Sequence, residues 1–167
     1  MLEDEPKRPV GFPVPGWTPR QRPPSTAMEG RTCRVEPLDA DRHARDLYQA
    51  NSADAEGLNW TYLSAGPFGN FDAYLDWMNS SCFHDDPMFH AIIDLSSGKA
   101  VGVASFMRID PNNGAIEVGN INYSPALHHP PAGTEAMYLM MKRAFDLGYR
   151  RYEWKCDARN AGSRAAA

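Results

Sequence analysis

The sequence predicts a mixed α+β domain whose strands form one mixed α/β sheet, with elements in the order β-α-α-β-β-β-α-β. Three strand-like runs between residues 88 and 123 are separated by tight-turn sequences, which is the pattern of an antiparallel meander. An amphipathic helix at residues 134–147 then lies between two strands. Because a strand reached through a helical crossover usually runs parallel to the strand before it, the sheet should contain both orientations.

The first half of the domain contributes one strand and two helices. Residues 32–38 form a short strand pattern, and Asp39 offers an N-cap to a helix at 41–50 that has one apolar face. A second helix fits residues 71–81. Between the helices, residues 52–69 contain three glycines and a proline and are expected to form a loop.

The loop at 52–69 is rich in apolar side chains for a connector, and it includes Trp60, Tyr62 and Phe68. A long aromatic loop is typical of a binding or lid segment. Hydrophobic packing explains the same residues equally well, because aromatic side chains also dominate cores. These three residues are therefore our substrate-binding candidates, and packing stays open as the alternative.

The second half alternates strands and turns until its last long helix. The sequences Ser-Ser-Gly-Lys and Asp-Pro-Asn-Asn-Gly mark two strong turns. The expected strands cover residues 88–95, 100–109, 115–123 and 152–156. Gly148 ends the helix at 134–147, and a further helix begins near residue 160.

Composition excludes several classes of protein. With 17 basic and 21 acidic residues the net charge is −4, so no nucleic-acid partner is expected. No apolar run reaches the roughly 18 residues of a membrane span, and the acidic first residues lack the apolar core of a signal peptide. The 3 cysteines are widely spaced and indicate reduced thiols. We expect a cytoplasmic protein without a metal site or membrane partner.

The first 28 residues differ from the rest, since they hold 7 of the 14 prolines. Proline fixes φ and removes a backbone donor, so this segment suits neither a helix nor a central strand. It should form an extended N-terminal arm before a domain at residues 29–167. Phe12 and Trp17 are the side chains expected to pin the arm to the domain, and a disordered tail is the alternative.

The segment at 120–148 is the most informative part of the chain. A strand runs into a short loop, and the loop opens directly onto the helix. The first N–H groups of a helix are unpaired and carry partial positive charge. Ala132, Gly133 and Thr134 can therefore hold a phosphate on backbone amides alone.

This order of elements resembles the GNAT family of N-acetyltransferases over roughly residues 30–167. The resemblance is closest to the RimJ/RimL branch, which acetylates N-terminal alanines of ribosomal proteins. The supporting stretches are Arg-Val-Glu-Pro-Leu at 34–38, Trp-Thr-Tyr-Leu and Gly-Pro-Phe within 60–68, Glu-Val-Gly to Gly-Thr-Glu-Ala at 117–136, and Ala-Phe-Asp-Leu-Gly-Tyr-Arg-Arg to Trp-Lys-Cys-Asp, Asn160 and Ser163 at 144–163.

The resemblance implies that acetyl-CoA is the co-substrate. The family's pyrophosphate loop has Gln or Arg, two residues, Gly, one residue, then Gly or Ala; here His128, Pro131 and Gly133 stand at those positions. Two prolines remove amides from this loop, and exposed histidines without a ligand are the alternative. The cofactor-binding candidates are Ile121, Asn122, Tyr123, His128, His129, Ala132, Gly133, Thr134, Asn160 and Ser163.

The implied chemistry is direct transfer, in which an amine attacks the thioester carbonyl of acetyl-CoA. The amine must lose a proton and the oxyanion needs a donor. Glu117 is the leading base candidate, acting through a water, and a solvent-facing carboxylate is its alternative. Asn120 lies in the Gly-Asn-Ile stretch expected to present a backbone N–H to the carbonyl.

The acceptor implied by the resemblance is a protein N-terminus or a small amine, and a homodimer is left open. The family pattern continues after the last helix with two antiparallel strands, so the domain at 29–167 is expected to be incomplete at its C-terminus. The competing hypothesis is a non-catalytic remnant that binds acetyl-CoA or serves as an interaction module.

Overall fold

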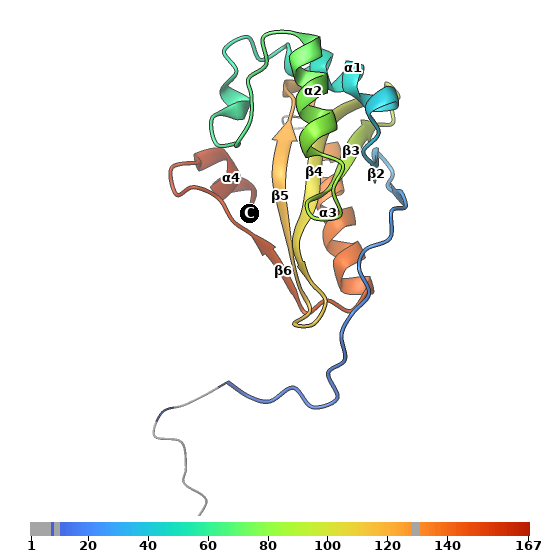
Figure 1. The fold of residues 1–167 in the computed structure, drawn as a ribbon, viewed down its shortest axis with the longest axis vertical. Helices are drawn as coiled ribbons and strands as arrows, with labels where there is room; N and C mark the ends of the chain where they lie inside the picture. Colours follow the sequence, from blue (N-terminus) through green and yellow to red (C-terminus); the bar gives the residue numbers. More distant parts are fainter. Residues whose placement is uncertain (1–7, 9–10, 128–130) are drawn as a thin grey trace, which may run out of the picture.

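The computed structural model describes residue 8 and residues 11–127 and 131–167 of the chain. Its centre is a six-stranded sheet in the order β1-β2-β3-β4-β5-β6 (Figure 1). The strands are β1 (Met28–Glu29), β2 (Cys33–Pro37), β3 (Met88–Asp94), β4 (Lys99–Asp110), β5 (Ala115–Tyr123) and β6 (Arg151–Trp154). All neighbours are antiparallel except β5 and β6, which are parallel. The predicted mixed α+β sheet is confirmed.

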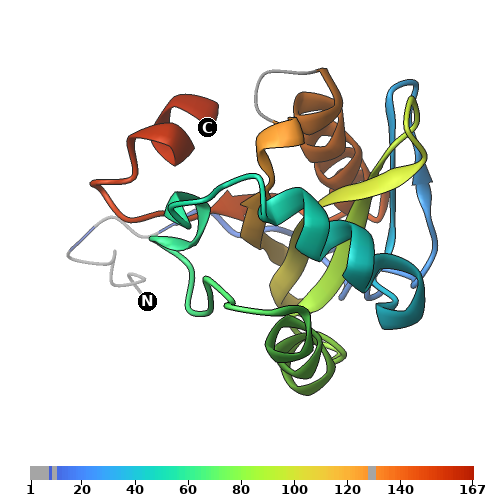
Figure 2. The same ribbon diagram turned by 90° about the horizontal axis from the view of Figure 1, so that it is seen from above.

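Helices cover both faces of this sheet. The helices are α1 (Ala40–Asn51), α2 (Phe71–Ser81), α3 (Pro131–Asp146) and the short α4 (Ala161–Ala166), with 3₁₀ turns η1 (Leu58–Trp60) and η2 (Pro125–Leu127). Seen from above, α1 and α2 lie on one side of the sheet and α3 on the other (Figure 2). No helix in the described part of the chain has both the length and the apolar character needed to cross a membrane.

The boundaries of several elements match their capping residues. Asp39 accepts a hydrogen bond from the Arg42 N–H at 3.0 Å, and Asn70 accepts one from the Ala73 N–H at 2.9 Å, so both are N-caps. The prediction placed the start of α3 at residue 134, but the helix begins at Pro131. A proline lacks only an N–H that would be unpaired in the first turn anyway, so it suits this position.

Each face of the sheet has its own hydrophobic core. Below α3 the fully buried side chains include Val35, Phe106, Ile116, Val118 and Met140. Below α1 and α2 they include Leu47, Tyr74, Met78, Ala91 and Val103. Burying side chains of this size contributes about 1.5–3 kcal/mol each, so two separate cores fix the sheet on both sides.

The Pro-rich arm is attached to the domain through Trp17. The Trp17 indole donates to the Asn112 carbonyl at 2.6 Å, and the Arg20 guanidinium stacks 4.3 Å from the indole ring. A Cβ built on Gly114 would lie 2.2 Å from the Trp17 ring, so only glycine leaves room for it. Phe12, by contrast, is 97% exposed. The prediction is confirmed for Trp17 and wrong for Phe12, which contacts no core.

Glu135 joins α3 to the turn that precedes β2. Its carboxylate accepts hydrogen bonds from the backbone N–H groups of Arg31, Thr32 and Cys33 at 2.9, 2.6 and 3.2 Å, and from the Thr32 hydroxyl at 2.6 Å. The Thr32 hydroxyl and these amides lower the pKa of Glu135 to about 2. The carboxylate therefore closes the end of the β1–β2 hairpin onto the helix.

We expect Glu135→Gln to lower the free energy of unfolding by about 1–3 kcal/mol, because several donors lose a charged acceptor. Because the pKa of Glu135 is lowered, its carboxylate stabilises the fold fully at a pH above its usual pKa of 4.5. This stabilisation disappears as the pH falls toward about 2. Urea unfolding of parent and variant at a series of pH values measures this. The exposed Glu29→Gln serves as control, and a parent–variant difference that stays constant down to low pH would contradict the assignment.

Candidate functional site

A cleft opens where β5 and β6 separate. The two parallel strands pair from Ala115 with Arg151 to Val118 with Trp154, and no later pairing is present among the described residues. Beyond this point β5 continues to Tyr123, whereas the chain after β6 turns away toward α4 (Figure 1). Backbone groups on this edge of β5 are therefore free to meet a ligand.

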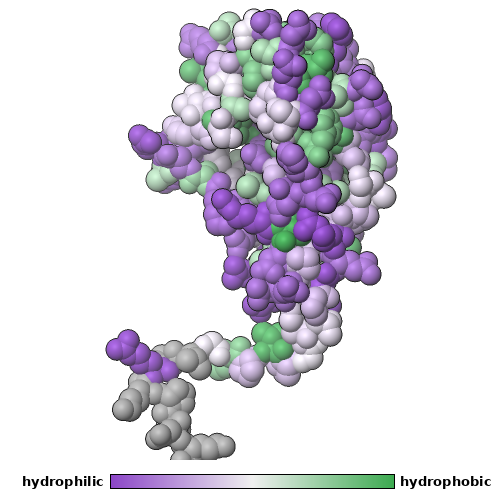
Figure 3. Space-filling view, viewed as in Figure 1, coloured by the Kyte–Doolittle hydropathy of each residue, from purple (hydrophilic) through white to green (hydrophobic). Residues whose placement is uncertain are grey.

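The cleft has a volume of about 960 Å³, which lies within the range of small-molecule sites. Figure 3 shows the surface on this side, with the α4 segment standing apart from the body of the molecule. The walls come from the sheet, from the chain after β6, and from the segment around η1. The lining residues are Leu58, Asn59, Tyr62, Leu63, Ser64, Met107, Arg108, Glu117, Gly119, Asn120, Ile121, Tyr123, Leu127, Trp154, Lys155, Cys156, Asp157, Asn160, Gly162, Ser163, Ala165 and Ala166.

A β-bulge shapes the sheet side of the cleft. The ladder with β4 shifts register beside Ser105, so that Asn120 and Ile121 together face one residue of β4. Asn120 has a φ of 49°, and its side-chain amide donates to the Ser105 hydroxyl at 2.9 Å. A non-glycine residue in the left-handed region is uncommon and needs such support. Both bulge residues line the cleft, so the bulge places their backbone groups at its wall.

Glu117 lies at the base of the cleft between two cations. Its side chain is 5% exposed, and both carboxylate oxygens accept from Arg108 at 2.7 Å while Lys155 also donates to it. The Lys155 pKa is raised because its ammonium donates to Glu117 and Glu153, so it stays protonated. Three donated hydrogen bonds already occupy this carboxylate, so a ligand that approaches it competes with Arg108 and Lys155.

Two residues that line the cleft also contact the first turn of α3, although no residue of α3 lines the cleft itself. Tyr123 and Leu127 line the cleft, and the Tyr123 hydroxyl donates to the Gly133 carbonyl at 2.9 Å. A Cβ built on Gly133 would lie 3.0 Å from the Tyr123 ring and 3.2 Å from the Leu127 carbonyl. Since Pro131 starts the helix, the N–H groups of the next three residues have no partner within it. An anion held there would face the end of the cleft.

The remaining predicted residues of the pyrophosphate loop divide into two groups. Ala132 is buried and Thr134 is exposed, both in the first turn of α3. His128 and His129 lie outside the described residues, so their prediction stays untested. Within the described residues, the candidate anion site is therefore the first turn of α3.

The short helix α4 forms the outer wall. The Asn160 side chain accepts from the Ser163 N–H at 3.0 Å and thus caps α4, while the Ser163 hydroxyl accepts from the Trp154 indole at 3.0 Å. Across the cleft, the Tyr62 hydroxyl donates to the Arg159 carbonyl at 3.1 Å. These bonds hold the outer wall to both β6 and the η1 loop.

The family follows from comparison with known proteins. A family model described as "Acetyltransferase (GNAT) domain" matches residues 33–167. This chain belongs to the GNAT acetyltransferase family. Family membership and the similar structures described next, which are named acetyltransferases, identify it as an N-acetyltransferase enzyme. The resemblance inferred from the sequence is confirmed at the level of the family.

Solved GNAT structures share the fold over most of this chain. A GCN5-related N-acetyltransferase from Brucella melitensis is 43% identical, with a TM-score of 0.89 over 92% of this chain and 70% of that protein. A probable GNAT acetyltransferase from Chromobacterium violaceum is 37% identical, with a TM-score of 0.86 over 98% of this chain and 81% of that protein. RimL, a ribosomal L7/L12 alpha-N-protein acetyltransferase, is 19% identical with a TM-score of 0.67 over 91% of this chain and 83% of RimL, which shows a common fold. A comparison with curated proteins finds no match.

The GNAT cleft brings together most of the predicted site residues but not all of them. Glu117, Asn120, Ile121, Tyr123, Asn160, Ser163 and Tyr62 line it. Asn122 is 3% exposed and does not line it, since neighbouring residues of a strand point to opposite faces. Trp60 and Phe68 line a separate cavity behind η1.

Two cations and a thiol of the GNAT cleft were not predicted from the sequence. Arg108 and Lys155 both contact Glu117, and the exposed Cys156 follows them on the wall. Period-2 alternation places Lys155 and Glu153 on one face of the strand pattern. That alternation alone could not reveal that Glu117 of β5 also contacts Lys155.

Proposed function

We propose that this GNAT protein transfers acetyl from acetyl-CoA directly to a primary amine. The supporting observation is the set of residues along the cleft. It includes the bulge of Asn120 and Ile121, where β5 and β6 separate, and Tyr123 and Leu127, which lie next to Gly133 in the first turn of α3. Acetyl-CoA has the matching parts, a thioester at one end of an extended arm and a pyrophosphate toward the other. A RimL structure in complex with coenzyme A is among those with this fold.

In this arrangement the thioester carbonyl lies against the bulge. A backbone N–H of the Asn120–Ile121 segment stabilises the oxyanion that forms when the amine attacks. The C–S bond then breaks, and coenzyme A leaves as a thiolate that takes a proton from solvent. The pantetheine arm then follows β5 past Tyr123, with Asn160 and Ser163 on the opposite wall. The pyrophosphate is held by the amides of Ala132, Gly133 and Thr134 at the positive end of α3. Here a glycine is needed because a larger residue would meet Tyr123 and Leu127.

Glu117 is the proposed general base, and a water relays the proton from the amine to its carboxylate. The arriving acceptor displaces Lys155 or Arg108, whose side chains are 56% and 63% exposed and can move into solvent. The other cation stays bonded to the carboxylate. Glu117 is the only carboxylate on β5, and it lines the cleft.

The acceptor enters between the η1 segment and the chain after β6. Leu58, Tyr62 and Leu63 supply an apolar wall there, opposite the acidic Asp157. A mostly apolar wall with a carboxylate favours a protonated amine on a short apolar residue, such as a protein N-terminus that begins with alanine or serine. Among proteins of the same fold, RimL is named an alpha-N-protein acetyltransferase, and a Vibrio cholerae protein is named a ribosomal-protein-serine acetyltransferase. A small amine is the second acceptor class.

Acetyl-CoA binding and turnover test this function together. Calorimetry should detect acetyl-CoA, and thiol release should then be seen with peptides starting in alanine or serine but not with the same peptides blocked at the N-terminus. Peptides that carry lysine but no free N-terminus, and small amines such as spermidine, identify the other acceptor class. Binding without release of thiol from any amine would refute the proposed activity and favour a binding module. No binding would refute the cofactor placement as well.

We also propose where the catalytic domain begins and in which compartment the enzyme works. The acetyltransferase domain follows the Pro-rich arm and begins near residue 29, just before the family match at 33–167. Cys33, Cys82 and Cys156 are free thiols. Reduced thiols of this kind are usual in the cytoplasm, which is where we place the enzyme.

A further inference from the structure

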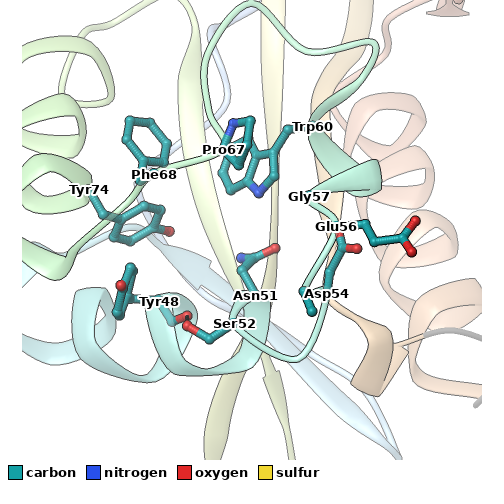
Figure 4. Close-up of a pocket in the computed structure, with 11 residues that line it drawn as sticks. Tyr48, Asn51, Ser52, Asp54, Glu56, Gly57, Trp60, Pro67, Phe68 and Tyr74 are labelled. Carbon is teal, nitrogen blue, oxygen red and sulfur yellow. Dashed lines mark hydrogen bonds between the residues drawn. The ribbon is translucent and has the colours of Figure 1, made fainter.

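A second cavity lies behind η1, on the side of α1 and α2 (Figure 4). Its volume is about 230 Å³, smaller than a typical drug-sized site but large enough for a compact ligand or for one end of a longer one. The residues that define its chemistry are Tyr48, Asn51, Asp54, Trp60, Phe68 and Tyr74. None of them lines the acetyl-transfer cleft.

One buried polar group faces this cavity without a partner. Asn51 is 8% exposed, and its side-chain amide donates to the Leu47 carbonyl at 3.0 Å. Its Oδ1 is fully buried and accepts no hydrogen bond from any described residue. Figure 4 shows the Asn51 carboxamide extending from α1 toward the Trp60 ring. A buried acceptor without a donor is costly, so the cavity favours a ligand that brings an N–H or O–H group.

The walls of the cavity are aromatic. The Trp60 ring lies 5.3 Å from Phe68 and 6.4 Å from Tyr74, and Tyr48 lies 5.8 Å from Tyr74, measured between ring centroids. Gly66 keeps the wall in place, since a Cβ there would lie 2.4 Å from the Trp60 ring. Faces of aromatic rings attract cations, and Trp attracts them most strongly.

The charge of the rim has one sign. Asp54 and Glu56 are among the lining residues, which include no lysine or arginine, and the Glu56 carboxylate points away from the aromatic rings (Figure 4). The Asp54 carboxylate accepts from the Asn59 N–H at 2.8 Å, which leaves acceptor capacity on its other oxygen. A positively charged ligand would meet the Asp54 carboxylate at the rim, aromatic rings on the walls and the Asn51 oxygen within.

We propose that this cavity binds a protonated primary alkylamine. The ammonium group donates to Asn51 Oδ1 and lies near Asp54, while the alkyl chain packs against Trp60, Phe68 and Tyr74. Each feature excludes an alternative ligand: the free oxygen needs a donor, the carboxylates disfavour an anion, and the aromatic walls disfavour a strongly hydrated metal ion. The inference does not rest on acetyl transfer, because binding here involves no residue of the cleft.

The position of this cavity links it to the cleft. Gly57 and Trp60 line the cavity, whereas Leu58 and Asn59, which stand between them in the sequence, line the cleft. The same short segment is thus the wall of both, and Asp54 is bonded to it. An amine in the cavity would hold this wall in the position seen here.

Titration of the parent chain with n-butylammonium chloride, followed by amide NMR without acetyl-CoA, tests the proposal. We expect saturable shifts at the Trp60 indole and the Asn51 side-chain amide, with a dissociation constant on the order of millimolar for so small a ligand. The uncharged n-butanol should bind about tenfold more weakly, since it loses a charge-assisted hydrogen bond. Tetramethylammonium, which has no N–H, should also bind more weakly.

Variants then assign the binding to the cavity. Asp54→Asn should weaken n-butylammonium about tenfold while its amide oxygen still accepts from Asn59. The control is Asp72→Asn on the exposed side of α2, which should leave the affinity unchanged. Shifts confined to Asn120, Ile121 and Trp154 would mean binding in the cleft and would overturn the proposal. Equal affinity for n-butanol and n-butylammonium would overturn it too, and this comparison depends on no variant.

Discussion

The Glu117→Gln variant should turn over about 100-fold more slowly than the parent chain, with little change in KM for either substrate. Glutamine keeps the size and one hydrogen-bond acceptor of the side chain, so the cleft retains its shape. What disappears is the proton acceptor at the base of the cleft, and the loss therefore affects kcat. Steady-state kinetics with a peptide acceptor measure it.

A positioning role of Glu117 would give a different pH dependence. Its carboxylate also holds Arg108 and Lys155, so removing the charge alters their position as well as proton transfer. If Glu117 is the base, the rise of kcat/KM from acid to neutral pH should vanish in the variant. If it only positions the cations, the profile should keep its shape at a lower level, which would contradict the assignment.

Glu153→Gln is the matched control for this experiment. Glu153 accepts from the same Lys155 at 2.6 Å, yet it does not line the cleft. Loss of its charge changes the local field without removing a group that faces the acceptor. We expect nearly parental kinetics, and comparable losses in both variants would point to the shared lysine.

Two elements have the bounds that the sequence predicted, and both for the same physical reason. The sequence predicted β5 at 115–123 and α2 at 71–81 with the observed bounds. A local sequence signal marks the start of each element: an Asn-Gly turn precedes β5, and Asn70 caps α2. Where such local signals exist, tertiary contacts do not have to decide the boundary.

The aromatic loop shows what the sequence could not resolve. Trp60, Tyr62 and Phe68 were predicted together as a substrate wall, but Tyr62 lines the cleft while Trp60 and Phe68 line the cavity behind it. In the tight turn of η1, successive side chains point in different directions. The composition of the loop does not predict which aromatic residue lines the cleft and which lines the cavity. That depends on how the turn packs against the rest of the domain.

The contacts of Glu117 show a second limit. Arg108 and Lys155 come from β4 and from the end of β6, and only the order of the strands in the sheet brings them to one carboxylate. The β5 pattern by itself could not distinguish a solvent-facing glutamate from a buried one. The burial of Glu117 follows from the two cations and from the cleft walls above it.

The Gly133→Val variant should bind acetyl-CoA about 10- to 100-fold more weakly than the parent chain. The expected loss corresponds to one charge-assisted hydrogen bond between a backbone N–H and the pyrophosphate, worth about 1.5–3 kcal/mol. The physical cause is steric, since the added side chain would press on the Tyr123 ring and the Leu127 carbonyl and shift the first turn of α3. Calorimetry with acetyl-CoA measures the loss.

Two comparisons separate a lost pyrophosphate site from damaged packing. S-acetylpantetheine has the thioester and the arm but no pyrophosphate, so its affinity should be the same for Gly133→Val and the parent. Gly69→Val places the same side chain where a Cβ meets nothing within 4 Å and should change neither affinity. Equal losses for both ligands in Gly133→Val would mean that the cleft itself is distorted, and the pyrophosphate would then have to be placed elsewhere. A loss confined to acetyl-CoA requires the start of α3 to touch the part of the molecule that S-acetylpantetheine lacks.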